Sequence, residues 1–235
     1  MTTITIPSKD GGSFNAYMAM PENVSRETKV PTVIVIQEIF GINDGIRKKC
    51  DWLASYGFMA IAPDLFWRIE PDIELSDQVP EELERAFQLF GEFNVDQGIE
   101  DLKATLHVAK GHANSTGKVG VLGYCLGGKL AYLMACRSES IASIGYYGVG
   151  IEELLVEANN ISGKLMLHIA EKDGFVPPEA QHKILEAFMP NDSIILNTYP
   201  DMDHAFTREG GDNYDEENAE MADNHSIAFL NENLK

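Results

Sequence analysis

The sequence has little positive charge for its length of 235 residues. It carries 18 Lys and Arg against 37 Asp and Glu, which gives a formal net charge of −19 at pH 7. Nucleic acids and anionic membrane surfaces are bound through clustered Lys and Arg, so this balance argues against both as partners. The acidic residues are best interpreted as a solvated surface that favours solubility. An anionic substrate would need a local group of arginines to overcome the general repulsion.

Long apolar runs and a disulfide pattern are also absent. The longest aliphatic run, Val33–Ile36, is far too short to cross a bilayer, and residues 1–10 have neither the basic start nor the apolar run of a secretory signal. Three cysteines are an odd number, so we expect free thiols in a reducing cytoplasm. No pair of histidines has the short spacing of metal ligands, so no metal and no cofactor is expected.

Short apolar segments that are rich in β-branched residues alternate with helical patterns. Strands are predicted at 14–20, 32–37, 58–62, 118–124, 140–147, 164–170 and 193–199. Helices are predicted from 43 or 44 to 57, within 80–110 with a break near 91–94, at 126–137, from 177 or 178 to 188, and at 214–234. This alternation predicts a three-layer α/β fold with a mostly parallel central sheet, in one domain spanning residues 1–235.

The segment Gly123–Gly127 reads Gly-Tyr-Cys-Leu-Gly and lies between an apolar strand and a helix. This is the Gly-x-nucleophile-x-Gly pattern of a strand–turn–helix elbow, with Cys125 at the nucleophile position. The turn is strained, which calls for glycines beside the nucleophile, and the helix N-terminus favours a thiolate and can stabilise an oxyanion. The alternative is a merely structural buried cysteine, which is what we expect for Cys50 and Cys136 within helices.

A thiol nucleophile needs a base, and the base needs an acid that orients it. In this kind of fold the acid and then the histidine follow the nucleophile, on loops after later strands. Asp173 comes shortly after the predicted strand 164–170, and His204 after 193–199. Either residue alone could belong to an ordinary turn. Three matches in the required order predict a Cys125–His204–Asp173 triad at the carboxyl edge of the sheet.

Six further segments spread over nearly the whole chain form a recognisable set. They are Val33–Gly41, Ala62–Phe66, Gly120–Gly128, Tyr146–Gly150, Asp173–Pro177 and His204–Phe206. On these segments the sequence resembles the dienelactone hydrolase (carboxymethylenebutenolidase) family of α/β-hydrolases. The resemblance implies hydrolysis of the lactone 4-carboxymethylenebut-2-en-4-olide to maleylacetate, through a thioester acyl-enzyme, in the degradation of aromatic compounds.

The resemblance also implies roles for residues outside the triad. Glu38 matches a glutamate that helps to activate the thiol, and the backbone N–H groups of Ile39 and Leu126 match the donors to the oxyanion. Arg208 matches one of two arginines that bind the carboxylate of the substrate. A small-molecule ester or lactone is therefore the expected partner, and the protein is expected to be a monomer or a small homo-oligomer.

The sequence departs from the family at the other half of this carboxylate site. Leu83 stands where the family has the second arginine, and Phe87 stands where it has a tyrosine. Arg85 is two residues away from that position, which turns it about 200° around a helix, and Arg68 is the other candidate replacement. Leu and Phe supply neither charge nor bidentate geometry, which favours a more apolar ester or lactone.

Two alternatives to a dienelactone hydrolase stay open at this point. The first is a carboxylesterase that uses the same triad on a more apolar range of substrates. The second belongs to another class of protein, a thiol redox sensor or binding protein on the same fold, in which Cys125 is an oxidisable thiol.

Overall fold

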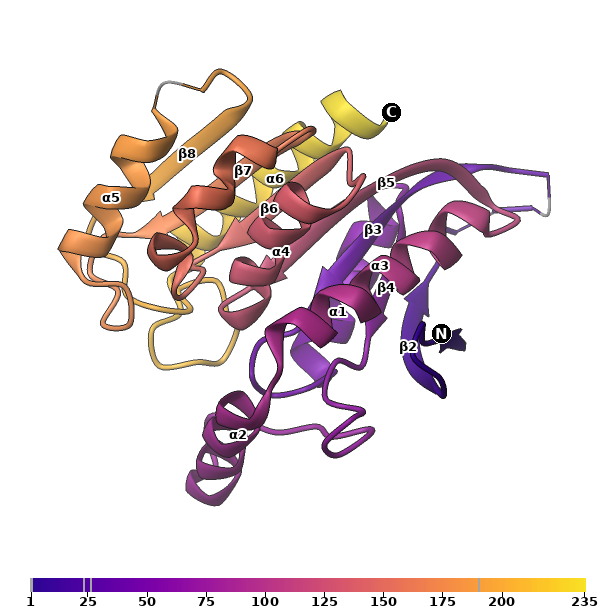
Figure 1. The fold of residues 1–235 in the computed structure, drawn as a ribbon, viewed down its shortest axis with the longest axis horizontal. Coiled ribbons are helices and arrows are strands. Elements are labelled where there is room, and N and C mark those ends of the chain that lie inside the picture. The colour runs from indigo at the N-terminus through magenta and orange to yellow at the C-terminus, as the bar shows by residue number, and fades with distance from the viewer. Residues whose placement is uncertain (1, 23, 26, 190) are drawn as a thin grey trace. The chain divides into compact units, whose positions relative to one another are not determined.

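The chain forms a mixed β-sheet with helices packed against it, in a computed structural model that describes residues 2–22, 24–25, 27–189 and 191–235. The strands follow the order β1-β2-β4-β3-β5-β6-β7-β8 along the sheet (Figure 1). The chain divides into two compact units, residues 1–121 and 122–235, and the boundary falls within β5 (Ser115–Tyr124). The predicted α/β fold is confirmed, whereas the single domain over 1–235 stays a prediction.

The first unit holds the antiparallel edge of the sheet and part of its parallel centre. Its other elements are β1 (Thr2–Pro7), β2 (Ser13–Ala19), β3 (Val30–Ile36), α1 (Asp44–Ser55), β4 (Met59–Pro63), α2 (Pro80–Glu92) and α3 (Val95–Gly111). β2 pairs antiparallel with β1 and β4, whereas β3 and β4 are parallel. α1 and α3 both pack on β3 and β4, which explains why Val33–Ile36 is fully buried.

The helix boundaries of this unit follow from capping side chains. Asn43 accepts a hydrogen bond from the N–H of Ile46 and so begins α1, as predicted. Asn94 caps α3 in the same way, and the break between α2 and α3 lies where the sequence placed it. Phe93 fills the space beside Gly98, since a Cβ at residue 98 would lie 2.3 Å from the Phe93 ring.

An arginine in the first unit fastens β1, β2 and α3 together. The Arg68 guanidinium donates two hydrogen bonds to the buried carboxylate of Asp101, at 2.8 and 3.0 Å, and two more to Asp10, both at 2.9 Å. Trp67 also donates to Asp101 through its indole N–H, at 2.9 Å, and stacks on Phe14 of β2. This network holds the N-terminal hairpin, whose first strand the sequence analysis did not predict.

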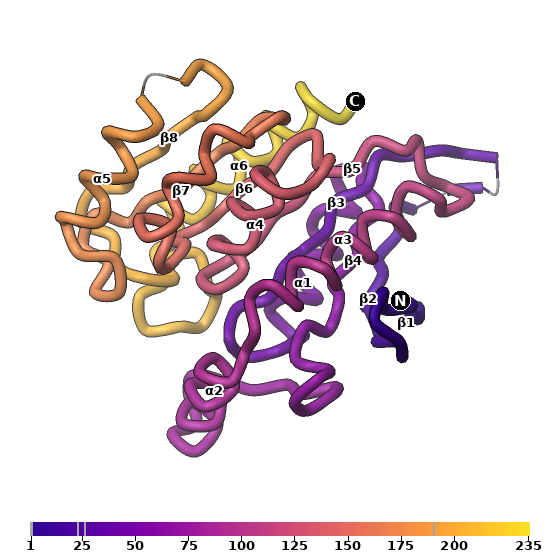
Figure 2. The backbone as a smooth tube through the Cα atoms, viewed as in Figure 1, coloured from indigo at the N-terminus to yellow at the C-terminus, as the bar shows by residue number. Residues whose placement is uncertain are grey.

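The second unit contains the parallel strands β6, β7 and β8. After the end of β5 it contains α4 (Leu126–Arg137), β6 (Ala142–Tyr146), two 3₁₀ turns η1 (Ile151–Glu153) and η2 (Leu155–Asn160), β7 (Lys164–Ala170), α5 (Pro178–Phe188), β8 (Ile194–Tyr199) and α6 (Glu216–Leu234). β6, β7 and β8 run side by side (Figure 2). α4 lies on one face, since a Cβ at Gly145 would be 2.8 Å from the Gly128 carbonyl oxygen.

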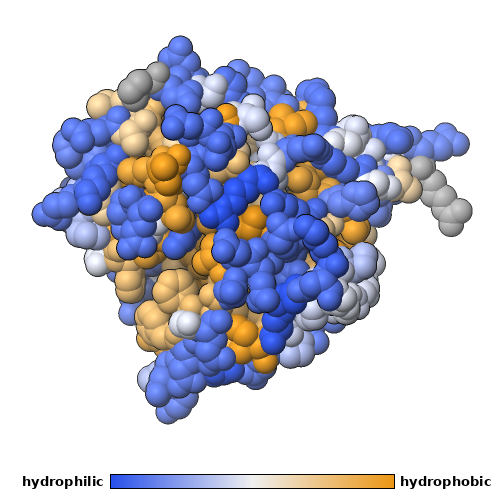
Figure 3. All heavy atoms as spheres, viewed as in Figure 1, coloured by the Kyte–Doolittle hydropathy of each residue, from blue (hydrophilic) through white to orange (hydrophobic). Residues whose placement is uncertain are grey.

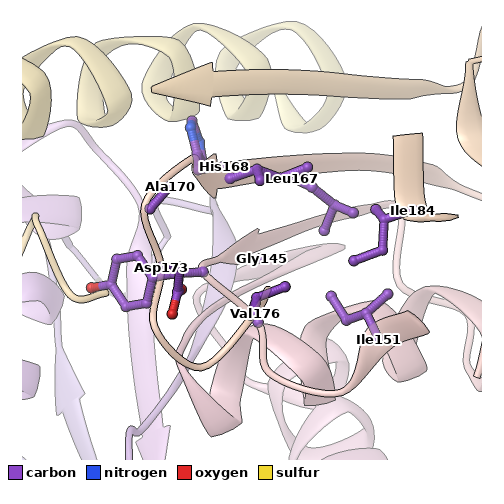
Figure 4. Close-up of a pocket in the computed structure, with 11 residues that line it drawn as sticks. Gly145, Ile151, Leu167, His168, Ala170, Asp173, Val176 and Ile184 are labelled. Carbon is purple, nitrogen blue, oxygen red and sulfur yellow. The ribbon is translucent and has the colours of Figure 1, made fainter. Parts of the chain in front are cut away.

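α6 covers the opposite face through a buried polar network. The Tyr146 hydroxyl lies 2.6 Å from Ser226 Oγ, and His168 bridges Ser226 at 3.0 Å and the Tyr199 hydroxyl at 2.8 Å. The Tyr146 and His168 rings stack at 4.2 Å between centroids. Successive strand residues point to opposite faces, so His168 faces α6 and Leu167 faces the other side (Figure 4). Three neighbouring strands are thus tied to one helix.

This network makes stability depend on acid through one histidine. Burial lowers the pKa of His168 from 6.5 to about 3. Between these values the unfolded chain binds a proton that the folded chain does not, so the free energy of unfolding falls as the pH falls below 6.5. At pH 5 the expected loss from this residue is about 2 kcal/mol. Urea unfolding at pH 7 and pH 5 measures this loss of unfolding free energy. Between the two pH values, His168→Gln should lose about 2 kcal/mol less than the parent. Equal losses in both proteins would contradict the assignment.

The surface is largely hydrophilic. Hydrophilic side chains cover most of the face seen in Figure 3, with patches of apolar side chains between them. No helix in the described part of the chain combines the length and the apolar character needed to span a bilayer.

Candidate active site

Cys125 lies at the tip of a tight turn between β5 and α4. Its backbone has φ 55° and ψ −114°, in a region that residues other than glycine rarely adopt. The turn is held by the Cys125 N–H, which donates to the Tyr146 carbonyl oxygen at 3.0 Å, and by the Cys125 carbonyl oxygen, which accepts from Gly128 N at 3.0 Å. A Cβ at Gly123 would lie 2.1 Å from the Gly127 carbonyl oxygen. The predicted elbow therefore forms, and its glycine spacing has a steric cause.

Asp173 and His204 lie on the loops that follow β7 and β8. His204 Nδ1 is 2.9 Å from Asp173 Oδ2, and both side chains are buried. The other carboxylate oxygen of Asp173 accepts a hydrogen bond from the Phe175 N–H at 2.8 Å. The acid is thus oriented by its own loop and in turn orients the imidazole.

The imidazole of His204 is also hydrogen bonded to the side chain of Cys125. Burial lowers the pKa of His204, but the hydrogen bonds and charges of Asp173 and Cys125 outweigh it and raise the pKa to about 10. A protonated imidazole is therefore stabilised between a carboxylate and a sulfur atom. This arrangement can hold a thiolate and can deliver or accept a proton beside it.

Two aromatic rings enclose His204. Phe175 and Tyr147 approach it edge-on, with ring centroids at 4.8 and 5.1 Å. The Tyr147 hydroxyl lies 2.8 Å from Thr207 Oγ1, a buried pair. Tyr147, Phe175 and Thr207 were not predicted from the sequence to belong to the site. Tyr147 and Phe175 lie inside the matching segments at 146–150 and 173–177, which was the available signal.

A small cavity lies behind Asp173, on the face of β6 and β7 that α5 covers. Its volume is about 20 Å³. Ile151, Leu167, Val176 and Ile184 line it, and their side chains surround the space in Figure 4. A cavity of this size has room for about one water molecule and is too small for a substrate. Asp173 is one of the residues that line it, so the acid borders a largely apolar space.

The remaining predicted site residues of the nucleophile region lie where the strands end. Leu126 is the first residue of α4, directly after Cys125. Glu38 and Ile39 follow β3 in the first unit, and both are buried. Arg208 lies four residues after His204 in the second unit, half-buried, and its N–H donates to the Ala205 carbonyl oxygen at 2.9 Å.

The residues predicted to shape the substrate pocket lie on α2. Leu83 is half-buried, and 47% of Phe87 is exposed. The two candidate arginines are already engaged with acidic side chains. Arg68 binds Asp101 and Asp10, as described above, and Arg85 donates to Glu70 through two nitrogens at 2.7 and 3.1 Å. Both guanidinium groups are therefore already paired with carboxylates of the protein, which argues against either one replacing the family's second arginine as a partner of the substrate carboxylate.

The other two thiols, Cys50 and Cys136, are buried within α1 and α4. All three cysteines are free. Burial raises the pKa of Cys50, and it raises the pKa of Cys136 to about 11. Within the described residues, no group of three or more His, Cys, Asp or Glu side chains is arranged to hold a metal ion.

Comparison with known proteins connects this geometry to a family. A model of the dienelactone hydrolase family matches residues 14–234. A protein of Azospirillum brasilense is 42% identical over the full length of both chains. Carboxymethylenebutenolidase 1 of Cupriavidus pinatubonensis is 39% identical, over 97% of this chain and 95% of the relative. The carboxymethylenebutenolidase of Pseudomonas putida is 34% identical, over 97% and 94%.

Solved structures agree with the fold. The crystal structure of a candidate dienelactone hydrolase from Klebsiella pneumoniae superposes with a TM-score of 0.84 at 28% identity, over 98% of this chain and 99% of that one. A dienelactone hydrolase-like promiscuous phosphotriesterase from metagenomic libraries gives a TM-score of 0.81 at 20% identity, over 100% and 99%, a likeness of fold.

Proposed function

Because the chain belongs to the dienelactone hydrolase family, we propose that it hydrolyses an ester or lactone bond with Cys125 as the nucleophile. His204 acts as the general base and general acid. Asp173 orients the imidazole and stabilises its protonated form. One observation carries the proposal: His204 is hydrogen bonded to Asp173 at 2.9 Å on one side and to Cys125 on the other. A nucleophile, a base and an acid joined in this way form the constellation that acyl transfer requires.

The first half of the reaction forms a thioester. The proton of Cys125 passes to His204, with Glu38 assisting its removal, and the sulfur attacks the carbonyl carbon. The oxyanion is stabilised by the backbone N–H groups of Leu126 and Ile39. When the tetrahedral intermediate collapses, the C–O bond breaks and the imidazolium of His204 donates its proton to the leaving oxygen.

The second half releases the acid. His204, now neutral, takes a proton from a water molecule that attacks the thioester carbonyl. The C–S bond breaks, the product leaves as a carboxylic acid, and the thiolate is restored beside the imidazolium. The mechanism needs a reduced Cys125, which supports our proposal of a reducing compartment such as the cytoplasm. No step calls for a cofactor or metal.

The substrate class follows from the relatives and from the charged residues. Relatives named carboxymethylenebutenolidase suggest the anionic lactone 4-carboxymethylenebut-2-en-4-olide, whose product is maleylacetate. Arg208 is the candidate cation for its carboxylate. A second candidate function, hydrolysis of more apolar esters, is favoured by Leu83 and Phe87 and by the engagement of Arg68 and Arg85 with acidic partners.

We expect p-nitrophenyl acetate to give a burst of nitrophenolate followed by steady turnover, because the thioester accumulates. The decisive measurement is kcat/KM for cis- and trans-dienelactone beside this neutral ester. Comparable turnover of dienelactone supports the first candidate, and turnover of the neutral ester alone supports the second. A chain that shows no burst and hydrolyses neither substrate, but forms a reversible sulfenate at Cys125, would be a thiol sensor instead.

A further inference from the structure

A carboxylate next to the histidine joins the two loops that carry the acid and the base. Asp203 Oδ1 accepts a hydrogen bond from the N–H of His204 at 2.6 Å and another from the N–H of Gly174 at 3.1 Å. Gly174 directly follows Asp173. One oxygen atom therefore connects the backbone of the histidine to the backbone beside the acid.

The loop of the acid is rigid without this contact. The Gln181 side-chain amide of α5 donates to the carbonyl oxygens of Ala170, Glu171 and Val176, at 3.1, 3.3 and 2.7 Å. Asp173 itself is held by the Phe175 N–H. The position of the acid is therefore set from α5.

The loop of the histidine contains strained backbone on both sides of His204. Asp201 has φ 66° and Ala205 has φ 63°, in the left-handed region that residues other than glycine occupy at a cost. Such a conformation persists only where neighbouring contacts hold it. The Asn213 side-chain amide holds the far side of the loop by donating to the His204 carbonyl oxygen at 2.9 Å. On the side that faces the acid, the Met202 carbonyl oxygen accepts from the Lys172 N–H at 2.8 Å, and Asp203 adds the contact next to His204 itself.

We propose that Asp203 is a positioning residue, whose carboxylate bridge between Gly174 and His204 keeps the imidazole at hydrogen-bonding distance from Asp173. The bridge acts through backbone N–H groups, so it fixes the loops and touches neither the substrate nor the sulfur. Its effect on the rate rests on the proposed function, whereas its effect on the hydrogen bond between His204 and Asp173 does not.

A second link between the same loops supplies a matched control. Lys172 forms an ion pair with Asp201, and both side chains are largely exposed. An exposed ion pair contributes little to stability. Lys172→Ala therefore removes a charged contact across the two loops while the Asp203 bridge stays intact.

The experiment compares Asp203→Ala, Asp203→Asn and Lys172→Ala. In Asp203→Ala we expect kcat for p-nitrophenyl acetate to fall about 10-fold with KM unchanged, because the imidazole is displaced by a fraction of an ångström. The downfield proton NMR signal of the hydrogen between His204 Nδ1 and Asp173 should broaden or move upfield. Asp203→Asn should keep both properties near those of the parent, since an amide oxygen accepts the same bonds, and Lys172→Ala should change neither.

Two outcomes would overturn the inference: an unchanged signal and kcat in Asp203→Ala, or equal losses in the alanine and asparagine variants, which would assign the effect to charge. If the parent hydrolyses no ester while the signal changes only in Asp203→Ala, the positioning role stands and the proposed function fails. Far-ultraviolet circular dichroism of all three variants checks that each substitution leaves the fold intact.

Discussion

Replacement of Cys125 by alanine is expected to lower kcat/KM for any ester substrate by roughly 10⁴-fold or more, because the atom that forms the thioester is removed. The fold should remain, since alanine is smaller than cysteine and the turn is held by backbone hydrogen bonds to Tyr146 and Gly128. Stopped-flow measurement with p-nitrophenyl acetate should show no burst. The free energy of unfolding measured in urea should fall by no more than about 1 kcal/mol, as expected for the loss of one small buried group.

Cys136→Ala is the matched control for this prediction. Cys136 lies in the helix that begins at the nucleophile and is also buried, but burial raises the pKa of its thiol to about 11. We expect this variant to keep the burst amplitude and kcat/KM of the parent. Full activity in Cys125→Ala would reject the proposed nucleophile. Equal losses in both variants would indicate that burial of the thiols, and not reaction at Cys125, supports activity.

Replacement of Gly123 by alanine is expected to give a large loss of stability for one added methyl group. The new Cβ would lie 2.1 Å from the Gly127 carbonyl oxygen and 2.4 Å from its carbon, and neither atom can rotate away as a side chain would. The elbow must open, which we expect to cost about 3 kcal/mol in the free energy of unfolding. Activity should fall with it, because Cys125 is carried by the same turn. Urea unfolding and ester hydrolysis together measure both effects.

Gly91→Ala makes the same chemical change without a clash. No atom lies within 4 Å of the Cβ that it would add, and the residue is in α2. Alanine is favoured over glycine inside a helix, so this variant should be as stable as the parent or more so by about 1 kcal/mol. If Gly123→Ala unfolds at the same urea concentration as the parent, the close approach of residues 123 and 127 is not the reason that the turn has glycine at position 123.

The elements with strong local signals were predictable. Residues 164–170 form β7 and 126–137 form α4 with the predicted bounds, and the break between α2 and α3 lies at the predicted 91–94. β1 was missed although Thr2–Pro7 alternates polar and apolar residues, because its stability comes from pairing with β2 and from the Arg68 network. Contacts of that kind join residues far apart in the chain, and local patterns do not contain them.

The candidate site shows the same division. Cys125, Asp173 and His204 could be predicted as a group because chain order and strand ends constrain them. Asp203, Tyr147 and Thr207 were not, because their importance lies in hydrogen bonds across loops, and an aspartate or threonine in a loop is an ordinary occurrence. Arg68 was a candidate for a charged contact with the substrate until the structure showed its guanidinium bound to Asp10 and Asp101.

The division of the chain into two compact units has a consequence for how this protein can diverge. The proposed nucleophile, acid and base all belong to residues 122–235, on loops whose spacing is set by parallel strands, whereas Leu83 and Phe87 belong to residues 1–121. If Leu83 and Phe87 contact the substrate as the sequence predicts, substitutions on α2 change substrate preference while the hydrogen bond between His204 and Asp173 stays within the other unit. This arrangement permits residues 1–121 to change in sequence while residues 122–235 stay constrained.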